Sequence, residues 1–334
     1  MEQRHLGRTG LRVSRLGLGT LTWGRDTDPH EAAEQLRTFV DAGGTLVDTS
    51  ASYADGGAEE LLGRLLREEV AREDVVLCTK AGVRRAGGRA VVDASRGSLL
   101  STLDASLRRL GTDHVDLWLV QSPDPRTPLE ETVATLRQAV ATGRARYVGL
   151  ANHAGWQVAR AATLLDDGTG LAAVEAEYSL LQRGVEREVV PAAQSLGVGL
   201  LAWSALGRGV LTGKYRRTVP PDSRAASAHL AGFVQPYLTR QAAAVVEACA
   251  TAAAGLEVSA LEVALAWVRD RAGVASALVG PRTTVQLKAC LAADDLRLPP
   301  EIRMALDDVT RPELGYPERF EVPAEPAVRP VAGV

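Results

Sequence analysis

The chain has 334 residues, of which 46% are apolar and 24% charged, with a net charge of −3. This balance is typical of a globular protein and provides neither a basic field for nucleic acid nor a polybasic patch for a membrane surface. No apolar run approaches the roughly 20 residues that cross a bilayer, and residues 1–11 lack the apolar segment of a signal peptide. We therefore expect a cytoplasmic protein with no nucleic-acid or membrane partner.

The cysteines and histidines bear on metal and disulfide chemistry. The three cysteines, Cys78, Cys249 and Cys290, are odd in number and far apart, and the five histidines are scattered. These spacings argue against a disulfide framework and against a protein metal site.

In chain order, the first predicted element is a hairpin. Arg4–Leu6 and Leu11–Ser14 flank a glycine-containing turn, a pattern that predicts two short strands capping one end of the domain.

Eight short apolar runs follow, each of strand length. Their near-continuous hydrophobicity is typical of strands in a parallel sheet covered on both faces. The predicted strands are Leu16–Thr20, Thr45–Asp48, Val75–Lys80, Val115–Gln121, Ala145–Asn152, Ala172–Tyr178, Val198–Ser204 and Ala275–Gly280.

Amphipathic segments alternate with these runs, and several end at glycines such as Gly111 and Gly197 that suit helix C-caps. The clearest predicted helices are His30–Ala42, Gly57–Ala71, Ser95–Leu110, Leu129–Thr142 and Thr284–Ala293. Eight strands alternating with helices predict a (β/α)8 TIM barrel. A doubly wound sheet would need fewer strands or a second domain, and no linker indicates one.

Two stretches interrupt this alternation. Lys214–Tyr237 contains two adjacent prolines and is expected to form a long loop over the barrel mouth. Residues 311–334 carry five prolines and are expected to be an irregular tail. We therefore expect a single barrel domain over residues 1–334, with its core at about 15–295.

The ends of the predicted strands carry the chemistry, because active sites of such barrels lie there. The second strand ends in Asp48, with Tyr53 five residues on, and the third ends in Lys80. Each residue alone is more often structural, but together they suit proton transfer to a carbonyl oxygen. An ammonium would lower the phenol pKa, and the carboxylate would aim that ammonium.

Several motifs then carry a family resemblance. They are residues 6–20 (LGRTGLRVSRLGLGT), 44–53 (GTLVDTSASY), 78–80 (CTK), 116–124 (DLWLVQSPD), 203–214 (WSALGRGVLTGK) and 280–283 (GPRT). In this order and over nearly the whole chain, they resemble the aldo-keto reductase superfamily. The resemblance implies an NADP(H)-dependent oxidoreductase that reduces an aldehyde or ketone, a small-molecule carbonyl substrate.

The resemblance also implies a catalytic tetrad, and one position departs from it. Tyr53 would be the general acid, Lys80 would tune it and Asp48 would orient Lys80. The fourth residue, histidine in the family, is Gln121 here. Glutamine keeps a neutral donor but cannot relay a proton. Gln121 is either a tolerated variant or one that alters specificity or turnover.

The cofactor would be held without a Rossmann motif, since Gly17–Gly19 is only GxG. The glycine-rich segment 207–215 has the wrong spacing for a triphosphate loop, and the resemblance assigns it to the pyrophosphate, with Arg208 or Lys214 as cations. Cofactor-binding roles are implied for Gly19, Thr20, Leu21, Asp48, Asn152, Glu175, Trp203, Ser204, Ala205, Leu206, Gly207, Arg208, Gly209, Leu211, Gly213, Lys214, Gly280, Arg282, Thr283, Gln286 and Cys290.

Three of these implied roles are specific. Trp203 would stack on the nicotinamide, Asn152 would bind its carboxamide, and Arg282 would hold the 2′-phosphate that favours NADPH over NADH. Two companions of Asn152 differ from the usual serine and glutamine, namely Ala151 and Glu175. An ionised Glu175 could only accept hydrogen bonds.

The substrate pocket would be walled by Trp23, Tyr53, Gln121 and Trp156, and Trp156 suits the core equally well. Two alternatives stay open. One is a cofactor-binding sensor module with little turnover, since ion-channel auxiliary subunits also resemble the family and lack the tetrad histidine. The other is reduction of an activated C=C bond. Substrate identity and oligomeric state are left undetermined.

Overall fold

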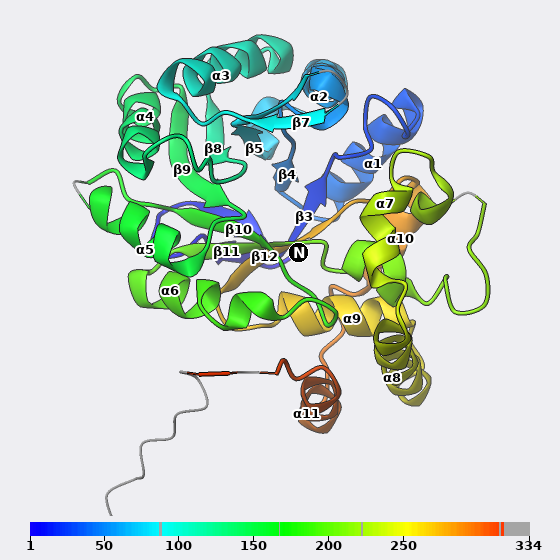
Figure 1. Ribbon diagram of the computed structural model, residues 1–334. Coiled ribbons are helices and arrows are strands. Elements are labelled where there is room, and N and C mark those ends of the chain that lie inside the picture. The colour runs from blue at the N-terminus through cyan, green and yellow to red at the C-terminus, as the bar shows by residue number, and fades with distance from the viewer. Residues whose placement is uncertain (87–88, 167, 222, 314, 317–334) are drawn as a thin grey trace, which may run out of the picture.

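The computed structural model describes residues 1–86, 89–166, 168–221, 223–313 and 315–316. Its centre is a closed barrel of eight parallel strands, ringed by helices (Figure 1). The barrel strands are β3 (Leu16–Gly19), β4 (Leu46–Asp48), β5 (Val76–Ala81), β8 (Val115–Val120), β9 (Ala145–Ala151), β10 (Ala173–Glu177), β11 (Gly199–Trp203) and β12 (Val274–Val279). All eight coincide with predicted strands, and the (β/α)8 prediction is confirmed.

Closure of the barrel depends on the register between its first and last strands. Ala277 of β12 pairs with Leu16 of β3, and every other neighbouring pair is also parallel. Because all strands run in one direction, their carboxyl ends meet at one mouth of the barrel.

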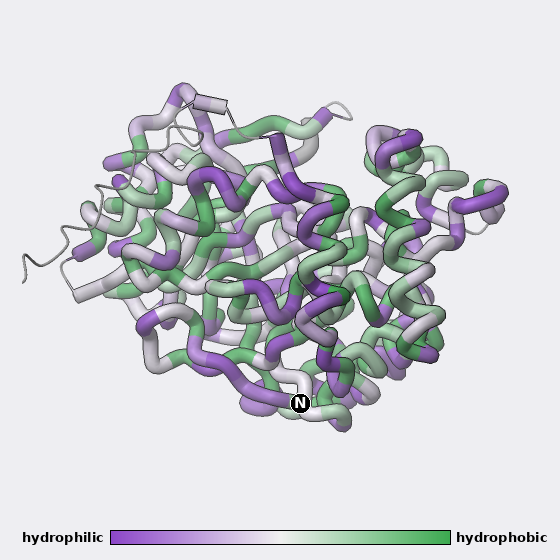
Figure 2. The backbone as a smooth tube through the Cα atoms, turned by 90° about the horizontal axis from the view of Figure 1, so that it is seen from below, coloured by the Kyte–Doolittle hydropathy of each residue, from purple (hydrophilic) through white to green (hydrophobic). Residues whose placement is uncertain are grey.

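The helices cover the outside of the barrel, and hydrophobic residues alternate along them with hydrophilic ones (Figure 2). The helices of the ring are α1 (Pro29–Asp41), α2 (Gly57–Glu68), α3 (Arg96–Leu110), α4 (Leu129–Ala141), α5 (Gly155–Leu164), α6 (Val189–Leu196), α9 (Ala260–Arg269) and α10 (Thr284–Ala292). Two further helices, α8 (Arg240–Leu256) and α11 (Pro300–Val309), pack against each other outside α9 (Figure 1). The predicted glycine caps at Gly111 and Gly197 are confirmed, since both adopt the left-handed conformation that ends a helix.

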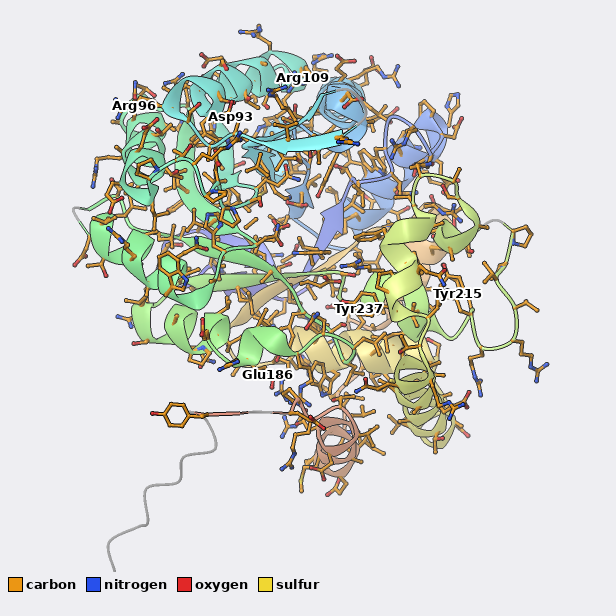
Figure 3. The ribbon with its side chains drawn as sticks, viewed as in Figure 1. Asp93, Arg96, Arg109, Glu186, Tyr215 and Tyr237 are labelled. Atoms are coloured by element: carbon orange, nitrogen blue, oxygen red, sulfur yellow. The ribbon has the colours of Figure 1, made fainter. Side chains whose placement is uncertain are left out.

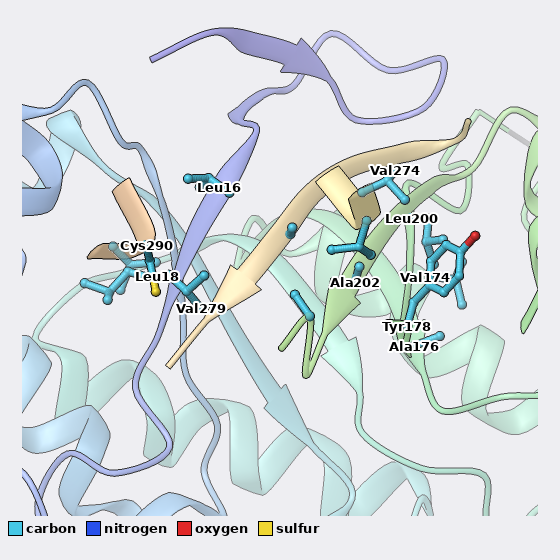
Figure 4. Packing of buried hydrophobic residues seen from close by; sticks show 14 of the residues in the cluster. Leu16, Leu18, Val174, Ala176, Tyr178, Leu200, Ala202, Val274, Val279 and Cys290 are labelled. Carbon is cyan, nitrogen blue, oxygen red and sulfur yellow. The ribbon is translucent and has the colours of Figure 1, made fainter. Parts of the chain in front are cut away.

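Two buried clusters fill the domain. The larger lies between strands and helices and includes Leu16, Leu18 and Val174 (Figure 4). The smaller fills the barrel interior, where Leu46, Leu117 and Leu201 pack together with Leu6 and Val13 of the N-terminal hairpin.

That hairpin consists of β1 (Gln3–His5) and β2 (Arg12–Ser14), paired antiparallel as predicted. Because the side chains of Leu6 and Val13 belong to the interior cluster, the hairpin closes the end of the barrel opposite the mouth. A second antiparallel pair, β6 (Val83–Ala86) with β7 (Arg89–Val92), lies after β5 and was not predicted.

The segment Lys214–Tyr237 was expected to form a long loop over the barrel mouth. Its described part holds the short helices η5 (Arg224–Ala226), α7 (Ala231–Val234) and η6 (Gln235–Tyr237), because the prolines end regular structure only locally. Other single turns are η1 (Tyr53–Gly56), η2 (Arg72–Asp74), η3 (Gly184–Glu186) and η4 (Gly207–Thr212). The predicted irregular tail lies outside the described residues, apart from 311–313 and 315–316.

Within the residues that the structure describes, no single helix is long and apolar enough to cross a membrane. Helices α8 and α9 reach that length and apolarity only together, across a bend of 101°.

Candidate active site

The period of the strands decides which side chains enter the barrel mouth. Successive residues point to opposite faces, so in β4 the inward Leu46 is followed two residues later by an inward Asp48. The same alternation places polar or aromatic side chains at inward positions near the carboxyl ends of four strands. They are Asp48, Lys80, Glu175 and Trp203.

Three of these side chains form a buried ionic cluster. Lys80 Nζ donates to Asp48 Oδ1 and, at 3.1 Å, to the carbonyl of Thr49. The same ammonium lies 3.2 Å from Glu175 Oε2. The side chain of Lys80 is 2% exposed and those of both acids are 4% exposed. One ammonium therefore faces two carboxyl groups away from water.

This crowding shifts the pKa values within the cluster. Burial and the Asp48 carboxylate raise the pKa of Glu175 to about 8. Burial acts to lower the pKa of Lys80, but the two carboxylates outweigh it and raise that pKa. The Lys80 ammonium therefore stays charged, while the raised pKa of Glu175 favours the protonated form of its carboxyl group. Glu175 can then donate a hydrogen bond, which the ionised form considered from the sequence cannot.

Tyr53 begins η1 and lies beside this cluster, with Lys80 Nζ 5.5 Å from the centre of its ring. The ammonium lowers the phenol pKa as expected, but burial outweighs it and the pKa of Tyr53 is raised. The expectation of a net lowering is therefore wrong for this protein, because taking a phenolate out of water disfavours it more than one neighbouring cation favours it.

Gln121 follows β8 at the same mouth, and two hydroxyl groups fix its amide. Ser50 Oγ donates to Gln121 Oε1 at 2.8 Å and Ser52 Oγ donates at 3.0 Å. Hydroxyl donors require the carbonyl oxygen of the amide on their side. The NH2 group is consequently directed away from the serines and is the donor that Gln121 can offer to a ligand.

A cavity of about 490 Å³ opens at this mouth. The residues from the sequence-based site that line it are Gly19, Leu21, Asp48, Tyr53, Lys80, Gln121, Asn152, Glu175, Trp203, Ser204, Ala205, Leu206, Arg208, Gly209, Lys214, Gly280, Arg282, Gln286 and Cys290. Two hydrogen bonds connect three of these lining residues. Trp203 Nε1 donates to Asn152 Oδ1 at 3.0 Å, and Asn152 Nδ2 donates to the carbonyl of Gln121 at 2.8 Å.

Some expected cofactor residues lie outside the cavity lining. Thr20 is fully buried and donates its hydroxyl to the carbonyl of Asp48 at 3.0 Å, and Thr283 accepts from Gln286 as the N-cap of α10. The remaining three residues outside the lining are Gly207, Leu211 and Gly213.

The two tryptophans expected to wall the pocket do not line this cavity either, so that assignment is corrected. Trp23 is fully buried, and its Nε1 donates to Gln35 Oε1 at 3.1 Å within the core. Trp156 lies on α5 and is 61% exposed. An aromatic wall comes instead from Phe233 of α7, whose ring stacks on Trp203 with centroids 6.3 Å apart.

Arg208 ties the segment after β11 to the α7 region. Its Nε and Nη2 donate to the two oxygens of Glu177 at 2.8 and 2.6 Å, a bidentate pair. The guanidinium also stacks 4.1 Å from the centre of Phe233 and 4.8 Å from that of Tyr237, which Figure 3 labels beside α7. Much of the cationic character expected of Arg208 is therefore matched by Glu177.

The guanidinium group of Arg224, a residue that was not predicted from the sequence, lies beside that of Arg282. Arg224 lines the same part of the cavity and donates to the carbonyl of Gly280 at 2.5 Å. Burial and the neighbouring Arg282 charge lower the pKa of Arg224. Two adjacent guanidinium groups favour an anion between them. No sequence motif marks Arg224, because it lies in the irregular segment after the prolines.

The carboxylates of the cluster also bear on metal binding. Among the described residues, Asp48, Cys78 and Glu175 form a group whose ligand atoms lie within 4.8 Å of one another. The Lys80 ammonium contacts both carboxyl groups of this trio, so its positive charge opposes the binding of a metal cation there.

Comparisons with known proteins agree with this geometry. The model of the aldo/keto reductase family matches residues 15–310. The chain is 34% identical to the uncharacterized oxidoreductase YrpG of Bacillus subtilis, over 92% of this chain and 96% of that protein. It is 34% identical to a probable voltage-gated potassium channel subunit beta of Oryza sativa, over 96% and 99%. It is 33% identical to an L-glyceraldehyde 3-phosphate reductase of Escherichia coli, over 86% of each chain.

Members of the matched family are oxidoreductases that use nicotinamide cofactors and act on small molecules. The match spans all eight barrel strands and every residue that lines the cavity. Barrel, cavity and sequence therefore lead to one assignment: this chain belongs to the aldo/keto reductase family.

Proposed function

We propose that this protein is an NADP(H)-dependent reductase of an aldehyde or ketone, with Tyr53 as the general acid. The observation that best supports this proposal is the buried Lys80–Asp48 pair beside the Tyr53 ring. All three residues line a cavity large enough for an extended ligand. The raised pKa of Tyr53 keeps its phenol protonated near neutrality. A protonated phenol is the form that gives a proton to a carbonyl oxygen.

The residues of the cavity fit a dinucleotide phosphate. Arg224 and Arg282 form a dicationic cradle at one end, which suits a 2′-phosphate. Asn152, Trp203 and Glu175 lie at the other end beside Lys80, where a nicotinamide ring would meet the acid. The bound cofactor would supply hydride to the carbonyl carbon. Residues of the protein would supply the proton and the hydrogen-bond donor for the carbonyl oxygen.

Gln121 would orient the substrate rather than protonate it. Its amide, held by Ser50 and Ser52, presents an NH2 donor that can bind the carbonyl oxygen. Tyr53 then transfers its O–H proton to that oxygen, and Lys80 stabilises the resulting phenolate. The Asp48 carboxylate keeps the Lys80 ammonium charged and aimed.

The class of substrate that the protein reduces can be tested directly. The purified full-length chain is assayed with NADPH against aldehydes, ketones, enals and sugars, including L-glyceraldehyde 3-phosphate because a relative carries that name. We expect aldehyde-dependent loss of the reduced nicotinamide absorbance. Tight NADPH binding without turnover on any carbonyl would instead support a sensor module, and turnover restricted to enals would support C=C reduction.

A further inference from the structure

The buried cluster at the mouth has one acid more than its ammonium can neutralise. Lys80 faces Asp48 and Glu175 at once, and all three side chains are almost completely buried. The other titratable groups that act on this cluster are Tyr53 on η1 and Cys78 on β5. Burial raises the pKa of both, so both stay uncharged and do not balance the extra acid. The cluster with both acids ionised would carry a net negative charge away from water, which is unfavourable.

The contacts of Lys80 favour a proton on Glu175 for a geometric reason. Asp48 receives the direct hydrogen bond from Lys80 Nζ, whereas Glu175 Oε2 lies 3.2 Å from that nitrogen without a well-oriented hydrogen-bond partner. The weaker partner of the shared cation is the acid that keeps its proton. Glu175 also lines the cavity, so a ligand there changes its surroundings.

We infer that Glu175 makes the cavity respond to the redox state of the cofactor, by keeping its proton against a neutral reduced nicotinamide and releasing it beside a positively charged oxidised one. This rests on the proposed binding of NADP(H) in this cavity. The O–H bond of the carboxyl breaks and the proton passes to solvent, with no electron transferred. The freed carboxylate then offers the oxidised ring an opposite charge, which the glutamine usual at this position cannot do.

The consequence is a thermodynamic linkage between pH and redox selectivity. If NADP+ binding releases a proton and NADPH binding does not, then rising pH favours NADP+ relative to NADPH. The ratio of the two dissociation constants should change by up to about tenfold per pH unit between the pKa values that Glu175 has in the NADP+ complex and in the NADPH complex. Protons exchanged by the cofactor phosphates are common to both forms and cancel in the comparison.

Calorimetric titration of the full-length chain with NADP+ and with NADPH, near neutral pH in two buffers of different ionisation enthalpy, counts the protons released by each. We expect more protons released by NADP+, by a large fraction of one per site. Glu175→Gln should abolish this difference. Glu59→Gln should retain it, because Glu59 is a fully buried carboxylate bound by Thr79 and Arg109 outside the cavity lining.

Asp48→Asn offers a second variant that does not alter Glu175 itself. It leaves Glu175 as the sole carboxylate at Lys80, so Glu175 should be ionised with either cofactor and the difference should again vanish. Equal proton counts for the two cofactors in the unmodified protein, or a difference that persists in Glu175→Gln, would overturn the inference while leaving NADP(H) binding established. Failure of both cofactors to bind would overturn the proposed function together with it.

Discussion

The amine of Lys80 lies 5.5 Å from the centre of the Tyr53 ring while it also donates to Asp48. A cation held in this way stabilises a phenolate without being free to move, which is what proton transfer from Tyr53 needs.

Replacing Tyr53 with phenylalanine should remove the proton donor and leave the ring in place. We expect kcat to fall by about 100-fold to 10,000-fold, the usual contribution of a general acid. NADPH binding, followed by nicotinamide fluorescence, should change little. Tyr147→Phe is the matched control, since Tyr147 lies on β9 and does not line the cavity. Lost NADPH binding would place Tyr53 outside the chemistry.

Gln121→His should raise turnover of simple aldehydes, because an imidazole can both donate to the carbonyl oxygen and exchange a proton near neutral pH. Steady-state kcat/KM for an aldehyde series measures this gain. An unchanged or lower value would mean that Gln121 is adapted to a substrate of its own.

Removing the two hydroxyl groups that hold Gln121 tests its orientation separately. In a Ser50→Ala, Ser52→Ala double variant, Oε1 of Gln121 loses both donors. The amide can then rotate, and kcat/KM should fall by about twofold to tenfold, the worth of a neutral hydrogen bond. The same two serine substitutions should lower kcat/KM much less in a Gln121→Leu background, where no amide remains to be oriented. An equal loss in both backgrounds would contradict the proposed coupling.

Arg224→Ala and Arg282→Ala should each weaken NADPH by about tenfold to 100-fold, since each removes a charge-assisted contact to a phosphate. NADH, which lacks the 2′-phosphate, should be affected much less. Arg303→Ala on α11 is an exposed control that changes net charge alone. Equal losses for both cofactors would contradict the phosphate assignment, and measured dissociation constants decide it.

Glu175 also predicts how stability depends on pH. Its pKa is raised from 4.5 to about 8 in the folded protein, so between these values the folded state holds a proton that the unfolded chain has lost. Stability from this group is therefore lost as pH rises from about 5 to 8. Glu175→Gln should gain stability over the unmodified chain as pH increases, seen as a widening difference in Tm between mildly acidic and alkaline buffer. A difference that is constant with pH would contradict the shift.

Much of the site follows from local pattern. Asp48 and Lys80 end runs of apolar residues, and the two-residue period of a strand places them on the same face as the buried Leu46 and Cys78. Trp203 follows by the same reasoning on β11. Parallel strands bring these ends to one mouth, so their proximity could be predicted before any coordinates.

Other parts of the site could not be predicted. Arg224 meets Arg282 only because a segment without periodic pattern folds back over the mouth. Trp23 and Trp156 were expected in the pocket, but one is fully buried and the other is largely exposed. Aromatic side chains suit core, surface and pocket alike, so their type does not reveal their location.

The sequence by itself determined the eight-stranded barrel, the strand ends that carry polar groups and the family, because these depend on periodicities and motifs within short segments. Only the tertiary structure decided the raised pKa values of Glu175 and Tyr53 and the orientation of Gln121. Each of these depends on burial and on charges or hydroxyl groups from strands and turns distant in the chain, and electrostatic interactions become strong only where folding has removed the water.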